Sequence, residues 1–175
     1  MTVLLFVDAN VFIYSNDDSE PHKRARAAAW LDQLWKEETG RTSMQVLSEY
    51  YVNLKKIADP GVSGDELWAR VEKYLAWNPL DIDRSVLKLA RDIEKRWRIS
   101  WWDAMVVAAA QIEYCSVLLT EDLQDGMVFG SVTVRNPFKF DVQESRAGYP
   151  VVARPENPHR PRGRPRRVPQ SAPNP

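Results

Sequence analysis

Short apolar runs along the chain alternate with longer segments in which apolar residues recur every three to four positions. The run VLLFV at residues 3–7 is continuous and β-branched at both ends, which is typical of a strand buried in a parallel sheet. Similar runs predict strands over residues 117–120 and 131–134, a short strand over 41–43, and a candidate strand over 79–82. These strands are far apart in the chain, so long segments must connect them.

The connecting segments predict helices, because their apolar residues have helical spacing. The predicted helices cover residues 21–38, 45–58, 64–76, 85–97 and 102–114. Pro21 stands near the start of the first helix, Gly40 is the residue expected to end it, and Asp59-Pro60-Gly61 breaks the second. Strands that alternate with helices indicate an α/β fold with a central, mostly parallel sheet.

Composition places this pattern in a globular domain. The chain has 175 residues, of which 44% are hydrophobic and 27% charged. No apolar run approaches the roughly 20 residues of a membrane span, and the start lacks the features of a signal peptide, so we expect a cytoplasmic protein. The single cysteine, Cys115, excludes an internal disulfide and a cysteine-rich zinc site, and we expect it in the core.

A net charge of zero conceals two different parts of the chain. Residues 141–175 carry seven arginines and three acids, for a net charge of +4, so residues 1–140 carry −4. Eight of the twelve prolines fall between residues 150 and 175, where large apolar residues are nearly absent. Such a segment cannot bury enough surface to offset its ordering entropy. We therefore predict one domain over residues 1–140 and a disordered Pro/Arg-rich tail over 141–175.

Four acidic residues stand in apolar surroundings. Asp8 follows the first strand, Asp122 follows the strand at 117–120, Asp103 begins an apolar helix, and Glu49 lies early in its helix. Parallel α/β sheets bind ligands beyond the carboxyl ends of their strands. Clustered carboxylates repel one another until a proton or a divalent cation relieves them, and Mg²⁺ and Mn²⁺ prefer oxygen ligands. Taken singly, each acid also fits a helix cap, a turn or a solvated helix face.

Four strings in order, FVDANVFIY, SMQVLSEYY, RISWWDAMVVAAA and LLTEDLQDG, resemble the PIN-domain family over about residues 2–140. In detail they resemble the VapC-type toxin ribonucleases of type II toxin–antitoxin systems. The resemblance implies a three-layer α/β sandwich, the PIN-like fold. It also implies an acidic metal site with catalytic Asp8, Glu49, Asp103 and Asp122.

The same resemblance assigns supporting roles to three polar residues. Asn10 corresponds to the residue that supports the first Asp, and the Thr120 hydroxyl, with that of Ser100, corresponds to a group that orients the site. The fourth acid stays open among Glu121, Asp122 and Asp125. The family's pattern favours Asp122, because it follows the hydroxyl by two residues.

The function implied is a Mg²⁺- or Mn²⁺-dependent endoribonuclease that hydrolyses RNA phosphodiester bonds with a metal-activated water. The resemblance also implies a cognate antitoxin and a homodimer. Two rivals remain: a catalytically silent PIN-like module that binds nucleic acid or a partner, and a metal-dependent phosphatase. The phosphatase normally needs a second acid where this chain has Asn10.

Contacts with nucleic acid are weakly indicated by basic residues. Lys55-Lys56 and Lys95-Arg96, the latter with Arg91 and Arg98, are candidates for RNA contact. The tail segment RPRGRPRR at 160–167 resembles an AT-hook, in which Arg162 and Arg164 would enter a DNA minor groove. The tail could equally act as an electrostatic arm for RNA, or fold onto its own acidic site and weaken it.

Overall fold

The computed structural model describes residues 2–139. The predicted tail at 141–175, with Arg162 and Arg164, lies outside the described residues.

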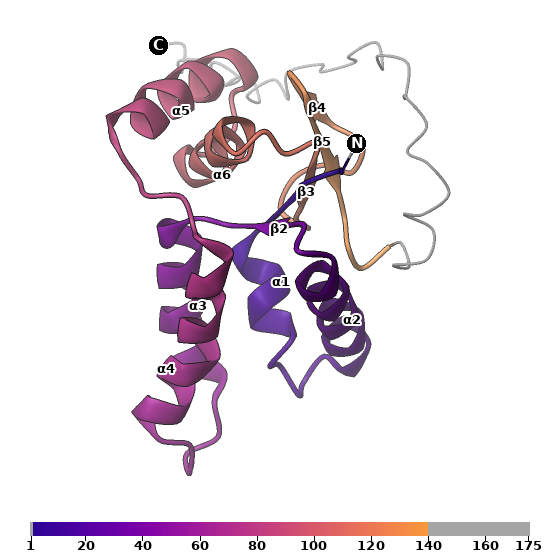
Figure 1. The fold of residues 1–175 in the computed structure, drawn as a ribbon, viewed down its shortest axis with the longest axis vertical. Helices are drawn as coiled ribbons and strands as arrows, with labels where there is room; N and C mark the ends of the chain where they lie inside the picture. The colour runs from indigo at the N-terminus through magenta and orange to yellow at the C-terminus, as the bar shows by residue number, and fades with distance from the viewer. Residues whose placement is uncertain (1, 140–175) are drawn as a thin grey trace, which may run out of the picture.

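A five-stranded sheet in the order β2-β1-β3-β5-β4 forms the centre of the fold (Figure 1). Its strands are β1 (Leu5–Val7), β2 (Gly40–Arg41), β3 (Val117–Leu119), β4 (Val128–Phe129) and β5 (Val132–Arg135). All neighbouring strands pair in parallel except β4 and β5, which form an antiparallel pair. The predicted mixed α/β fold with a mostly parallel sheet is confirmed.

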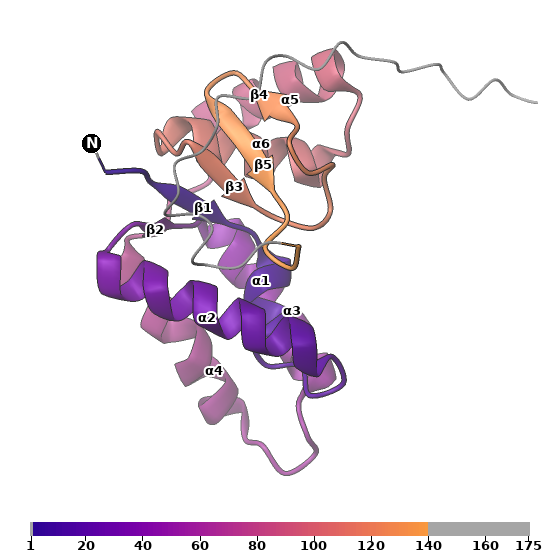
Figure 2. The ribbon, with the colours of Figure 1, turned by 90° about the vertical axis from the view of Figure 1, so that its right-hand side faces the viewer.

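Helices account for most of the described chain. They are α1 (Ala9–Tyr14), α2 (Pro21–Glu37), α3 (Met44–Ile57), α4 (Gly64–Glu72), the 3-10 helix η1 (Lys73–Trp77), α5 (Arg84–Trp97) and α6 (Trp101–Ile112). Figures 1 and 2 show α5 and α6 together on one side of the sheet and α2 on the other. Within residues 2–139, no helix combines the length and apolar character that a membrane crossing requires.

The strand order places a switch point between β1 and β3. The chain moves from β1 to one neighbour, β2, and later returns to the other neighbour, β3. Right-handed connections put the connecting helices of such a sheet on opposite faces, and parallel α/β sheets bind ligands at the carboxyl ends of strands at a switch point. Because Val7 pairs with Leu119, Asp8 and Thr120 are the first residues beyond this edge.

The sequence analysis missed two short elements and predicted one strand too many. Helix α1 and strand β4 are absent from the predicted elements: α1 continues the apolar run of β1 after one polar residue, and β4 has only two residues. The candidate strand at 79–82 makes a single bridge, between Ser43 and Leu80. Elements this short contain too few residues to show a helical or strand periodicity.

Gly40 does not end α2. The helix ends at Glu37, and Glu38 takes the left-handed conformation there, with φ of 57°. Gly40 lies buried in β2, where an added Cβ would stand 2.5 Å from a ring carbon of Trp77. The glycine therefore serves close packing between the sheet edge and an aromatic ring.

Candidate active site

Four polar side chains meet at the switch point. The Thr120 hydroxyl donates to Asp8 Oδ2 over 2.7 Å, and Asn10 Nδ2 lies 3.2 Å from the same oxygen. The Asn10 amide also lies 2.9 Å from Thr120 Oγ1 and 3.1 Å from Asp122 Oδ2. The Asp122 backbone N–H donates to Thr120 Oγ1. Parallel pairing of β1 and β3 thus joins residues more than 100 positions apart into one cluster.

Asp8 is the buried acid of this cluster, with 6% of its surface exposed. Burial raises the pKa of its carboxyl from 3.8 to about 7. The Thr120 hydroxyl and the Ala9 backbone N–H oppose that rise by stabilising the carboxylate, whereas the negative charges of Asp122 and Glu49 add to it. Asp8, Asp122 and Glu49 are therefore electrostatically coupled.

Glu49 lies on α3 and acts on Asp8 through its negative charge. Its carboxylate accepts a hydrogen bond of 2.8 Å from the Gln45 side chain one turn earlier on the same helix. Ser43 caps this helix by accepting from the Val46 N–H, and the helix follows directly from β2. Strand β2 thus delivers α3, and with it Glu49, to the edge where β1 ends.

Asp103 lies in the first turn of α6. Ser100 caps the helix by accepting from the Asp103 N–H, and its hydroxyl donates to Asp103 Oδ2 over 2.7 Å. Within residues 2–139, no hydrogen bond joins this pair to Asp8, Asn10 or Asp122. The structure shows a cap that holds Asp103 in one orientation and does not show contact with the cluster.

Comparison with known proteins identifies the fold. A family model for the PIN domain matches residues 5–124. The chain belongs to the PIN-domain family. PIN domains are in general nucleases, so the acids found at the switch point stand in a fold that acts on nucleic acid. A search of curated proteins found no significant match.

A solved structure has a similar fold. A toxin–antitoxin complex from Klebsiella pneumoniae contains a chain that is 17% identical to this one, with a TM-score of 0.52. The alignment covers 79% of this chain and 99% of that one. At this identity the likeness concerns the fold alone.

The donor chemistry of this PIN domain fits the divalent metals that PIN nucleases typically use. The cluster offers only oxygen ligands, and the buried Asn10 Oδ1 has no hydrogen-bond partner among the described residues. In the same part of the chain, however, no group of three His, Cys, Asp or Glu side chains is placed so that it could hold a metal ion. The cluster therefore has the right ligand types for a divalent metal, but these ligands do not surround one point as they would around a bound ion.

Two of the three candidates for the fourth acid are engaged elsewhere. Glu121 forms an ion pair of 2.7 Å with Lys23 of α2. Asp125 accepts a hydrogen bond of 2.8 Å from the Asn136 N–H and lies 3.7 Å from Arg135 Nε. Asp122 alone of the three is bonded to Asn10. This geometry favours Asp122 as the acid that acts with Asp8.

Sequence reasoning missed the cation beside the cluster. Lys23 donates to Glu121 and, over 3.0 Å, to the Tyr14 hydroxyl, and its ammonium lies 4.2 Å from the Tyr14 ring centroid. These contacts hold the pKa of Lys23 above its usual range, mainly through the Glu121 hydrogen bond. The one signal in the sequence was the pair of adjacent acids Glu121 and Asp122, which favours a nearby cation.

Cys115 takes no part in the site. It is 1% exposed, and burial raises the pKa of its thiol to about 12. The prediction that this cysteine belongs to the core is confirmed, and nucleophilic thiolate chemistry is disfavoured at neutral pH.

The raised pKa of Asp8 predicts a pH-dependent stability. The folded state holds this proton more tightly than the unfolded state, so the free energy of unfolding falls as the pH rises from about 4 to about 7 and is then constant. Without divalent metal, the stability of Asp8→Asn relative to the parent should therefore rise over this interval, by roughly 4 kcal/mol of unfolding free energy at most, and its Tm should rise with it. Thermal unfolding in EDTA at several pH values measures the difference. A Tm difference that does not change with pH would contradict the prediction.

Proposed function

We propose that this PIN domain is a Mg²⁺- or Mn²⁺-dependent endoribonuclease that acts as the toxin of a toxin–antitoxin pair of the VapC type. The observation that carries the proposal is the buried Asp8 at the switch point, electrostatically coupled to Asp122 and Glu49. Burying an ionised carboxylate costs free energy, and a bound cation would offset that cost at Asp8.

The side chains have distinct roles in this proposal. Asp8, Glu49, Asp103 and Asp122 would hold the ion, and their carboxylates would have to approach one another, because no three acids of the described residues are placed to hold it. Asn10 and Thr120 orient Asp8, because both contact its Oδ2, while the Ala9 N–H contacts Oδ1. The bound ion would neutralise the scissile phosphate and activate a water for in-line attack.

The proposed partner is an antitoxin. The support is the structural similarity to a chain of a toxin–antitoxin complex. An antitoxin arginine that pairs with the acidic cluster would compete with the metal for the same carboxylates. A homodimer and a cytoplasmic location belong to the same proposal.

Cleavage of cellular RNA by the full chain tests the function. Purified protein with Mg²⁺ or Mn²⁺ should yield discrete fragments that EDTA abolishes. The same ions should raise the Tm of the parent and leave that of Asp8→Asn unchanged, because a ligand that binds only the folded state stabilises it. No cleavage with either ion, together with an unchanged Tm, would sink the proposal.

A second candidate is a PIN-like module that binds nucleic acid without cleaving it. The observation in its favour is that no three acids of the described residues are placed to hold an ion. RNA binding without metal-dependent cleavage would support this module. Metal-dependent cleavage excludes it.

A further inference from the structure

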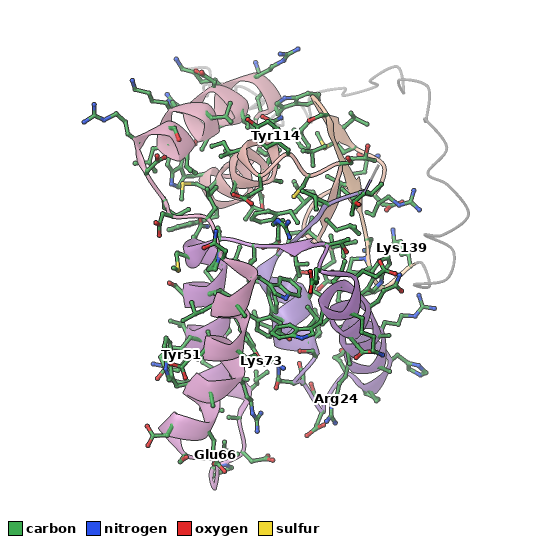
Figure 3. The ribbon with its side chains drawn as sticks, in the orientation of Figure 1. Arg24, Tyr51, Glu66, Lys73, Tyr114 and Lys139 are labelled. Atoms are coloured by element: carbon green, nitrogen blue, oxygen red, sulfur yellow. The ribbon has the colours of Figure 1, made fainter. Side chains whose placement is uncertain are left out.

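The solvent-facing side of α5 carries a row of cations. Arg84, Lys88, Arg91 and Lys95 recur at intervals of four, three and four residues, which aligns them along one side of the helix, and all four are exposed. The opposite side of α5 is buried, and the helix packs against α6. Figure 3 shows nitrogen-tipped side chains that extend outward around α5. At 1.5 Å per residue the row spans about 16 Å.

This row contrasts with the charge of the rest of the domain. Residues 84–98 carry six cations and two acids, a net charge of +4, whereas the remainder of residues 1–140 carries −8. Arg91 pairs with Glu94. Within the described part of the chain, Arg84, Lys88 and Lys95 form no ion pair. The row therefore presents uncompensated positive charge on an acidic body and would attract a polyanion to this face.

The row is followed in the chain by Asp103, one of the proposed metal-site acids. Residue Arg98 follows α5, and α6 begins three residues later, with Asp103 in its first turn. Trp102, directly before Asp103, is 61% exposed. Among the described residues its indole has no aromatic partner, unlike Trp68, which packs edge-on against Tyr51.

We propose that the row on α5 binds the backbone of single-stranded RNA and that Trp102 stacks on a base next to the cleaved bond. This inference rests on the proposed ribonuclease function. An acidic site repels phosphate, so cations nearby must supply the affinity for the substrate. The exposed indole of Trp102, the residue before Asp103, supplies a stacking platform that tolerates any base.

RNA binding by the full chain tests the row. Fluorescence anisotropy measures the Kd of a labelled single-stranded RNA of about 20 nucleotides at several salt concentrations, with Asp8→Asn as the parent so that the RNA stays intact. The triple variant Arg84→Gln, Lys88→Gln and Lys95→Gln should raise the Kd about tenfold or more. It should also lower the slope of log Kd against log salt by about 2, because each phosphate contact on a single strand contributes about 0.7.

A matched triple controls for net charge. Lys36→Gln, Lys73→Gln and Lys139→Gln remove the same charge from exposed positions away from α5. They should change the Kd less than about threefold. Equal loss of binding in the two triples would overturn the proposal, since it would show a general electrostatic effect.

Trp102 has a separate signature. Trp102→Ala should raise the Kd about tenfold at every salt concentration and leave the slope unchanged, because stacking releases no counterions. Trp102→Phe should keep most of the affinity. A Trp102→Ala variant that binds like the parent would overturn the stacking role.

The outcomes separate this inference from the function on which it rests. If the wild-type chain cleaves RNA with metal and the α5 triple variant binds RNA as well as the parent, the RNA-binding role of the row is rejected and the proposed ribonuclease function is retained. If the α5 triple variant binds RNA more weakly and the wild-type chain does not cleave RNA, the RNA-binding role of the row is supported and the proposed ribonuclease function is rejected. Absence of RNA binding by the parent, or a clear preference for duplex DNA of the same length, would also overturn the inference.

Discussion

Replacing Asp8 by asparagine should lower the rate of RNA cleavage by about 10³-fold or more and leave the fold intact. The change removes the negative charge at the centre of the proposed metal site, where a bound cation contributes several kcal/mol of charge stabilisation. The new amide keeps the shape of the carboxylate. Its oxygen can still accept from the Ala9 N–H, and its nitrogen can face the Thr120 hydroxyl. Fragment yield per unit time on a defined RNA measures the effect, and circular dichroism measures the fold.

Asp125→Asn is the matched control for this experiment. Asp125 lies on the loop that also carries Asp122, yet its carboxylate bonds the Asn136 N–H instead of the cluster. Its substitution should leave the cleavage rate within about threefold, because the charge it removes is not part of the proposed site. An unimpaired Asp8→Asn enzyme contradicts the mechanism, and a large loss in Asp125→Asn would move the fourth acid to that residue.

Replacing Phe12 by alanine should destabilise the fold by about 3–5 kcal/mol. Phe12 is fully buried in α1, and its ring centroid lies 5.4 Å from that of Tyr50, 4.7 Å from Tyr74 and 6.0 Å from Trp77. Alanine would leave a cavity between α1, α3 and η1 that the rigid rings cannot fill. Urea unfolding followed by circular dichroism gives the change in the free energy of unfolding.

Val52→Ala is the control for the effect of burial. Val52 lies on α3 and is 47% exposed, so its truncation should change the free energy of unfolding by no more than about 0.5 kcal/mol. A loss of less than about 1 kcal/mol in Phe12→Ala would show that the aromatic cluster repacks around the smaller residue.

The long helices and strands β1, β2, β3 and β5 could be predicted from the sequence, because each depends on the pattern within one segment. The helix predicted over 21–38 is observed as Pro21–Glu37, and that over 85–97 as Arg84–Trp97. Asp8 could be singled out as well, because an acid directly after an apolar strand conflicts with its surroundings. Each of these features depends on residues that are close together in the sequence.

Local pattern failed where a distant residue decides the outcome. Gly40 was predicted to end a helix. A side chain is excluded there by the Trp77 ring, which lies 37 residues later in the chain and cannot be foreseen from the residues around Gly40. The residue types around Glu121, Asp122 and Asp125 do not separate them, and only the family's pattern favours Asp122. Lys23 and Asn136, the partners of Glu121 and Asp125, come from other elements.

The sequence by itself determined that this chain is an α/β domain of the PIN family with acids after its first and third strands. Only the tertiary structure decided that Asn10 and Thr120 contact the same oxygen of Asp8, that Asp122 shares the Asn10 amide, and that the row on α5 stays exposed. The physical reason is the register of β1 against β3. Pairing Val7 with Leu119 brings two distant strand ends together, and neither strand by itself specifies that partner.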